Sequence, residues 1–195
     1  MESLKWENIF LKELEEFMLT APAISLVHKT DHAFRVWKIC EKIGKKTGAD
    51  FEVLCAAALL HDLGRHYGLE IHGEKSAELA EPILKKHNFP EEKIPIVLDA
   101  IAKHDYNMSK RKRKTIESKI LYDSDKIDAF GAVGVYRHIL FTIQGRIRIS
   151  GVVPKLKERY RGLSLPESKK AAKKDYEYTV DYFKKLTKEL KKNKP

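Results

Sequence analysis

Apolar residues recur along most of the chain with the spacing of α-helices. Trp6, Phe10, Leu14 and Phe17 follow one another at intervals of three and four residues, which places them on one helical face. The same spacing predicts further helices over residues 32–45, 73–87, 90–104 and 115–127 and from residue 166 onward. Alternation typical of strands is scarce, so the pattern predicts an all-α protein.

Two segments depart from this amphipathic pattern. Val53–Leu60 is apolar on every face and is expected at the centre of the core, in a helix that Asp50 caps and Gly64 ends. Residues 143–153 hold two glycines and three isoleucines, which favour a loop or a short hairpin.

Length and composition bound the class of protein. The 195 residues fit one domain, and with 43% hydrophobic and 34% charged residues the chain is typical of soluble globular proteins. The longest apolar run is far shorter than the roughly 20 residues that cross a bilayer. The first residues also lack the pattern of a signal peptide. We therefore expect a cytoplasmic protein with no membrane partner.

The net charge of +10 is concentrated in two places. Residues 110–114 are all basic, and the segment from Lys155 onward contains 14 basic and 6 acidic residues. Such surfaces attract nucleotides or nucleic acid, although a solvated basic face is an equally good interpretation. Since no aromatic residue is interleaved in the run 110–114, base stacking there is weakly supported, and nucleic-acid binding through this run stays open.

The strongest chemical signal is the pair His61-Asp62, which ends the most apolar helix of the chain. Two hydrophilic side chains carried there by a buried helix would be costly without partners. A divalent metal ion accepts both an imidazole nitrogen and a carboxylate oxygen as ligands. His32 opens an earlier helix, and Asp125 interrupts a later apolar one, so both are candidates to join the pair.

The motifs around these residues resemble the HD-domain superfamily of metal-dependent phosphohydrolases. They read Asp-His-x-x-Arg-Val at 31–36, Ala-Ala-x-Leu-Leu-His-Asp-Leu-Gly-Arg at 56–65 and Leu-Tyr-Asp-Ser-Asp-Lys-Ile-Asp-Ala at 121–129. The resemblance covers roughly residues 25–140. It implies a helical bundle, which we expect to form a single domain over 1–195 with an additional C-terminal helical extension over about 153–195.

The resemblance also implies a metal site. Its ligands would be His32, His61, Asp62 and Asp125, and Asp62 would in addition help to orient the attacking water. Two carboxylates among four ligands suit Mn²⁺, Mg²⁺, Fe²⁺, Ni²⁺ or Co²⁺ as well as Zn²⁺, so the identity of the metal is left open.

Two further histidines, His72 and His104, lie between the pair and Asp125 in the sequence. Dinuclear members of the superfamily place additional histidine ligands in similar stretches, so the resemblance allows a second metal ion. The alternatives are that both histidines bind the substrate phosphate or protonate the leaving oxygen, or that they are simply polar residues near helix ends.

An anionic substrate requires cations near the metal. Arg65 and Lys126 are the nearest in sequence to the expected ligands, and Lys103 and Arg137 follow. Some nucleotidases of the superfamily carry an acid three residues after the pair, where this chain has Arg65. This departure counts against a strict 5′-nucleotidase.

The sequence therefore predicts a phosphohydrolase that cuts a phosphate ester or anhydride bond of a small phosphorylated molecule, with a nucleotide as the leading substrate. The alternatives are a phosphodiesterase for cyclic or short oligonucleotides and a non-catalytic nucleic-acid-binding protein with a structural metal. The last helix carries a narrow apolar seam, which suits a monomer or a homodimer.

Overall fold

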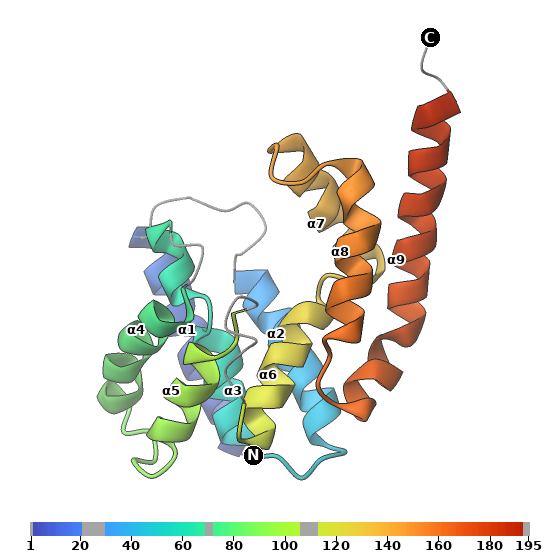
Figure 1. Cartoon of the computed structure of the whole chain (residues 1–195). Helices are drawn as coiled ribbons and strands as arrows, with labels where there is room; N and C mark the ends of the chain where they lie inside the picture. The colour runs from blue at the N-terminus through green and yellow to red at the C-terminus, as the bar shows by residue number, and fades with distance from the viewer. Residues whose placement is uncertain (1, 21–29, 69–71, 106–112, 193–195) are drawn as a thin grey trace. The chain divides into compact units, whose positions relative to one another are not determined.

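The structure is a computed structural model that describes residues 2–20, 30–68, 72–105 and 113–192. Within these ranges the chain is helical and has no strand, which confirms the all-α class (Figure 1). The chain divides into two compact units, Met1–Ser124 and Asp125–Pro195. The expectation of one domain over the whole length stays a prediction.

The first unit is built around one short buried helix. Its elements are α1 (Glu2–Thr20), α2 (Thr30–Gly44), α3 (Phe51–Leu60), the 3₁₀ helix η1 (Leu63–Tyr67), α4 (Gly73–Lys86), α5 (Ile94–Ala102) and most of α6 (Ile116–Ile127). Helix α3 packs against α1, α2 and α5, while α4 packs against α5 and η1. Helix α3 is therefore enclosed by other helices of the same unit.

The position of α3 follows from its sequence. Every residue from Val53 to Leu60 is exposed by 1% or less, and burial of each large apolar side chain is worth about 1.5–3 kcal/mol. The Asp50 carboxylate accepts the backbone N–H groups of Glu52 (2.9 Å) and Val53 (3.2 Å) and so caps the helix. The expected core segment and its N-cap are both confirmed.

Two expected helix boundaries are wrong. Helix α3 ends at Leu60, and Gly64 lies inside η1, where its backbone N–H donates to the Ser76 hydroxyl oxygen at 2.9 Å. The helix expected over 90–104 begins at Ile94, with Pro95 in its first turn. Proline is tolerated there because the first backbone N–H groups of a helix have no partner within it.

The second unit contains α7 (Gly131–Ile143), α8 (Ile149–Arg161) and α9 (Pro166–Lys192). Both α7 and α8 pack against α9, and Ala172 and Phe183 of its expected seam are fully buried. Tyr160 stacks on Tyr176 with ring centroids 4.1 Å apart. The first half of the seam thus faces helices of its own unit. Among the helices that the structure describes, α9 included, none combines the length and hydropathy of a membrane span.

The expectation of a loop or hairpin over residues 143–153 is wrong for most of that segment. Ile143 ends α7, residues 144–148 form a turn in which Gly145 has a φ of +70°, and Ile149 begins α8. Val152 of this helix is fully buried. Packing against α9 therefore outweighs the local preference of isoleucine for extended backbone, a preference that depends strongly on context.

Candidate metal centre

The pair His61-Asp62 lies where α3 gives way to η1. His61 is the C-cap residue of α3, and its Nδ1 lies 2.8 Å from the carbonyl oxygen of Ala58, one turn earlier. Since a carbonyl oxygen can only accept, Nδ1 carries the proton, and Nε2 of the neutral ring presents its lone pair. The end of the buried helix thus presents a nitrogen lone pair that can bind a metal ion, on the side of the ring away from the helix backbone.

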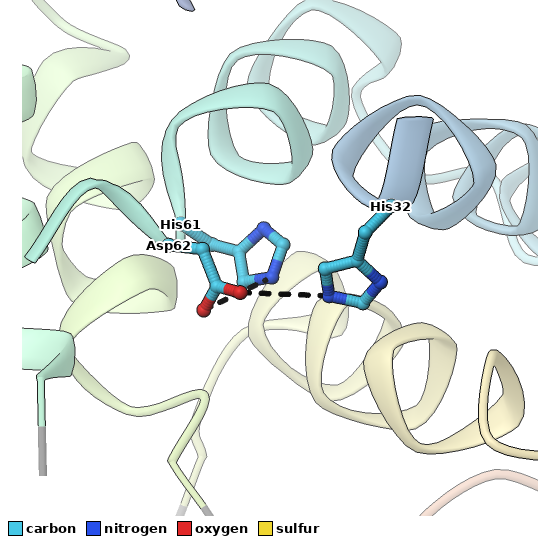
Figure 2. A group of neighbouring side chains, drawn as sticks. All are labelled: His32, His61 and Asp62. Atoms are coloured by element: carbon cyan, nitrogen blue, oxygen red, sulfur yellow. Dashed lines mark ion pairs between the residues drawn. The ribbon is translucent and has the colours of Figure 1, made fainter. Parts of the chain in front are cut away.

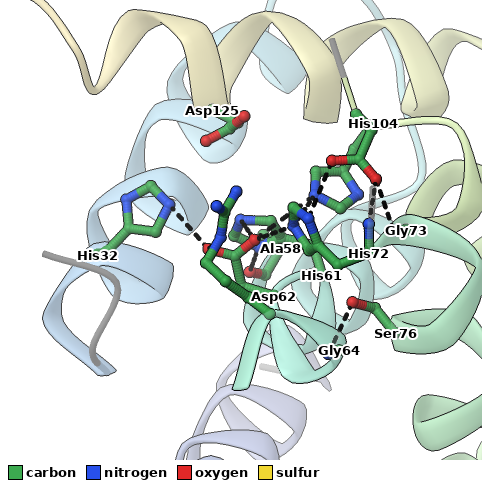
Figure 3. A network of polar contacts seen from close by, with 12 residues as sticks. His32, Ala58, His61, Asp62, Gly64, His72, Gly73, Ser76, His104 and Asp125 are labelled. Atoms are coloured by element: carbon green, nitrogen blue, oxygen red, sulfur yellow. Dashed lines mark hydrogen bonds and ion pairs between the residues drawn. The ribbon is translucent and has the colours of Figure 1, made fainter. Parts of the chain in front are cut away.

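Four imidazole rings lie around the carboxylate of Asp62 (Figure 3), and Figure 2 shows two of them, those of His32 and His61. Nε2 of His32, in the first turn of α2, lies 3.5 Å from Asp62 Oδ2, and Nε2 of His61 lies 3.5 Å from Oδ1. Nε2 of His72, just before α4, is 2.6 Å from Oδ1, and Nε2 of His104, just after α5, is 3.5 Å from it. Helices distant in sequence thus deliver five polar side chains to one place.

The Asp62 carboxyl is held in its ionised form. Burial by itself would raise its pKa, but the charge of Arg65 and the neighbouring imidazoles of His61, His104 and His72 hold the pKa well below its usual range. An ionised carboxylate among imidazoles is a strong ligand for a divalent ion.

The described residues contain two overlapping groups with the geometry of a metal site. One is His32, His61 and Asp62, the other is Asp62, His72 and His104, and within each the ligand atoms lie within 4.8 Å of one another. His104 Nδ1 lies 2.6 Å from the carbonyl oxygen of Ile101, so its Nε2 is also an acceptor, and it faces His72 Nε2 at 3.1 Å. Acceptor atoms that converge in this way fit a bound cation, because a cation relieves their mutual repulsion.

Comparisons with known proteins agree with this centre. The sequence profile of the HD domain family matches residues 30–129, just over half of the chain, and includes His32, the His61-Asp62 pair and Asp125. The chain belongs to the HD domain family.

Relatives of this HD domain protein include the uncharacterized protein YpgQ of Bacillus subtilis, which is 27% identical over 139 residues that cover 67% of each chain. The crystal structure of YpgQ in complex with ADP matches with a TM-score of 0.76 at 22% identity over 97% of each chain. An HD-superfamily hydrolase from Bacillus thuringiensis has the same TM-score and identity and covers 97% of this chain and 98% of its own. At this identity the two structures show a shared fold.

The remaining expected ligand of the HD centre, Asp125, lies in the last turn of α6. It is the first residue of the second unit, its side chain is 12% exposed, and its Oδ2 lies 2.6 Å from the ammonium of Lys126. Its place among the metal ligands stays a prediction. Arg137, on α7, is buried and ion-paired with Asp128, so the structure gives this expected substrate contact a carboxylate partner within its own unit.

Of the cations expected to bind substrate, Arg65 lies at the centre itself. Its Nε is 3.2 Å from Asp62 Oδ2, and its side chain is 23% exposed. Lys103 directly precedes His104, but its ammonium is ion-paired with Asp99 one turn earlier on α5. The structure thus brings Arg65, but not the ammonium of Lys103, against the Asp62 carboxylate.

The basic run 110–114 falls largely outside the described residues. Arg113 and Lys114 are described, and the Arg113 guanidinium lies 3.3 Å from the ring centroid of Tyr122. Its Nε also donates to the carbonyl oxygen of Lys103 at 3.3 Å. These contacts fix Arg113 to the first unit, and a role of the run in binding nucleic acid stays a prediction.

Sequence reasoning missed Asp105 and the close backbone packing at two glycines. Asp105 Oδ2 accepts the backbone N–H groups of His72 (2.8 Å) and Gly73 (2.6 Å), and Oδ1 lies 3.0 Å from His72 Nδ1. A Cβ on Gly64 would come within 2.6 Å of the His72 carbonyl oxygen, and a Cβ on Gly73 within 2.7 Å of the Ala102 carbonyl oxygen. The available signal was a second His-Asp pair at 104–105 and a glycine directly after His72.

Proposed function

We propose that this protein is a metal-dependent phosphohydrolase that cuts a phosphate ester or anhydride bond of a nucleotide. The observation that carries the proposal is the convergence of four imidazole Nε2 atoms on one ionised, buried carboxylate. The ADP bound to the related YpgQ supports a nucleotide as the substrate class, and the similarity to an HD-superfamily hydrolase from Bacillus thuringiensis supports hydrolysis as the reaction.

In this proposal His32, His61 and Asp62 hold one divalent ion, with Asp125 as the fourth ligand. A divalent ion bound there supplies Lewis acidity toward a phosphoryl oxygen and toward a water molecule. The Asp62 carboxylate remains an acceptor at neutral pH because its pKa lies well below the usual range. It can therefore orient a water molecule by accepting one of its hydrogen bonds.

His72 and His104 hold a second divalent ion together with Asp62. For His104 this role fits its hydrogen bond better than donation to a phosphate does. In the neutral ring, the contact from His104 Nδ1 to the Ile101 carbonyl leaves Nε2 as an acceptor. Arg65 brings a positive charge to the same carboxylate, and a guanidinium can bind a phosphate group with two parallel hydrogen bonds. We propose that Arg65 contacts the substrate phosphate.

The proposal is tested by measuring phosphate and pyrophosphate release from a panel of nucleoside mono-, di- and triphosphates. The assay is run with Mn²⁺, Mg²⁺, Co²⁺, Ni²⁺ or EDTA on the wild type and on Asp62→Ala. Glu78→Gln is the matched control, because Glu78 is an acid on the surface of α4 with a side chain that is 66% exposed. We expect metal-dependent turnover in the wild type and the control, and a loss of at least about 100-fold in Asp62→Ala.

The product identifies the bond that is cut. Pyrophosphate marks cleavage next to the α-phosphate, and phosphate marks cleavage of a terminal group. Absence of turnover on every nucleotide with every metal would refute the proposal. Cleavage of cyclic or short oligonucleotides would then identify a phosphodiesterase. Salt-sensitive binding of oligonucleotides without cleavage would identify a nucleic-acid-binding protein with a structural metal.

A further inference from the structure

The net positive charge of the chain belongs to its second unit. Asp125–Pro195 contains 18 basic and 8 acidic residues, whereas Met1–Ser124 contains 20 of each. The basic run 110–114 is therefore offset by acids of its own unit, and the net charge of +10 is the charge of the second unit. A unit of this size with such an excess attracts polyanions, and the attraction weakens as salt is added.

Helix α9 carries lysines and tyrosines together on one exposed face. Lys170, Lys174, Tyr178, Tyr182 and Lys185 follow one another at intervals of three or four residues, so they line one side of the helix. All five side chains are exposed, the two tyrosines by 52% and 38%. At 1.5 Å per residue this α9 stripe is about 22 Å long. Other parts of α9 pack against α7 and α8 of the same unit.

The lysines of the α9 stripe are available to an anion. Two acids that flank the stripe pair with lysines outside it: Asp181 lies 3.1 Å from the ammonium of Lys184, and Glu177 lies 4.0 Å from that of Lys173. Within the described part of the chain, none of the three stripe lysines forms an ion pair. Phosphate groups of a ligand can therefore approach them without displacing an internal partner.

The two tyrosines indicate which polyanion fits the α9 stripe. An exposed tyrosine ring can stack on the face of an unpaired base while neighbouring lysines bind the phosphates of the same strand. In a duplex the base faces are stacked on one another, so a single strand fits better. An anionic membrane surface would instead require a continuous apolar face beside the basic residues, and the stripe has lysines on both sides of its tyrosines.

We propose that the α9 stripe binds single-stranded nucleic acid, with its lysines against phosphates and Tyr178 and Tyr182 stacked on bases. The proposal does not rest on the proposed hydrolysis of nucleotides, because it uses residues of α9 alone. Binding is therefore measured on the full-length protein in EDTA, where metal-dependent cleavage cannot occur. A failure of binding there leaves the test of the phosphohydrolase unaffected.

The experiment is fluorescence anisotropy with labelled oligothymidylate, oligouridylate and a DNA duplex, each of about 20 nucleotides per strand. We expect both single strands to bind more tightly than the duplex. Three lysine contacts predict a slope of about −2 in the logarithm of the binding constant against the logarithm of the salt concentration. A duplex that binds as tightly as the single strands would overturn the proposal, and this comparison needs no variant.

Lys174→Gln combined with Lys185→Gln tests the phosphate contacts. Each contact contributes about fivefold at about 0.1 M salt, so we expect this double variant to bind about 25-fold more weakly. The matched control is Lys42→Gln combined with Lys46→Gln, which removes the same charge from exposed lysines of the first unit. The control should lose less than about twofold. An equal loss in both would show attraction by net charge alone and would overturn the α9 stripe as the site.

Tyr178→Leu combined with Tyr182→Leu tests stacking at unchanged charge. We expect single strands to bind about 10–100-fold more weakly, with the salt slope kept, while the corresponding pair of Tyr→Phe changes retains the binding. Both positions are exposed, so the Tm should stay close to that of the wild type. Undiminished binding in the leucine variant would overturn the proposal. So would binding of the wild type to vesicles of phosphatidylserine and phosphatidylcholine without binding to either single strand.

Discussion

Gly73→Ala offers a sharp test of the packing around the metal centre, because two physical effects predict opposite signs. Gly73 is the first residue of α4, and alanine is favoured over glycine inside helices by about 0.8–1.0 kcal/mol. Propensity alone therefore predicts a more stable protein. A Cβ at this position would, however, lie 2.7 Å from the Ala102 carbonyl oxygen and 3.0 Å from that of Ile101.

The size of the clash determines which effect is larger. The distance of 2.7 Å is about 0.7 Å short of the 3.4 Å at which ordinary van der Waals contact begins, and the contacted atoms are backbone atoms that cannot rotate away. Overpacking of this kind costs about 1–3 kcal/mol. The start of α4 must also move away from Asp105, which weakens the hydrogen bond to the Gly73 N–H. We expect a net loss of about 1 kcal/mol, or a Tm lower by about 2–4 °C.

The assay is thermal unfolding of the metal-free protein, followed by Mn²⁺ titration. The matched control is Gly151→Ala in α8, where a new Cβ would meet only the Ile147 side chain at 3.5 Å. This control should keep the helical gain and raise the Tm, whereas Gly73→Ala should lower it and weaken Mn²⁺ binding. The reasoning is refuted if Gly73→Ala raises the Tm as much as the control does and leaves Mn²⁺ affinity unchanged.

Three further predictions concern the pH dependence, the metal and the core. Burial, with the charges of Arg159 and Arg137, lowers the pKa of His138 to about 3. In the unfolded chain this histidine binds a proton near pH 6.5, so the free energy of unfolding of the wild type should fall by roughly 1.4 kcal/mol per pH unit below 6.5. Urea unfolding at pH 7 and 5 should show a smaller fall for His138→Gln than for the wild type. Mn²⁺ at about 100 times its Kd should stabilise the wild type by about 2.7 kcal/mol for each site that it occupies, and an equal Tm shift in Asp62→Ala would contradict the site. Leu54→Ala, at a fully buried position of α3, should cost about 2–5 kcal/mol in urea unfolding, and a cost below about 1 kcal/mol would contradict its central place.

The sequence by itself determined the helical class and the position of α3. A segment such as Val53–Leu60, apolar on all faces, can be stable only where every face is covered, so its place in the core follows without any knowledge of its neighbours. The Asp50 cap is likewise local, because donor and acceptor lie two and three residues apart. The family follows from the order of short motifs, each of which is continuous in the sequence.

The tertiary structure decided which polar side chains meet. His72 and His104 lie 32 residues apart, and only the packing of α4 against α5 brings their Nε2 atoms to 3.1 Å. Asp105 was overlooked because its partners are backbone groups at the start of another helix, and such a contact leaves no periodic pattern. Residues 143–153 were misjudged for the same reason: the helix that begins at Ile149 is stabilised by its contact with α9. Sequence patterns reflect interactions between residues that are close in the sequence, whereas contacts between distant segments depend on how the helices pack.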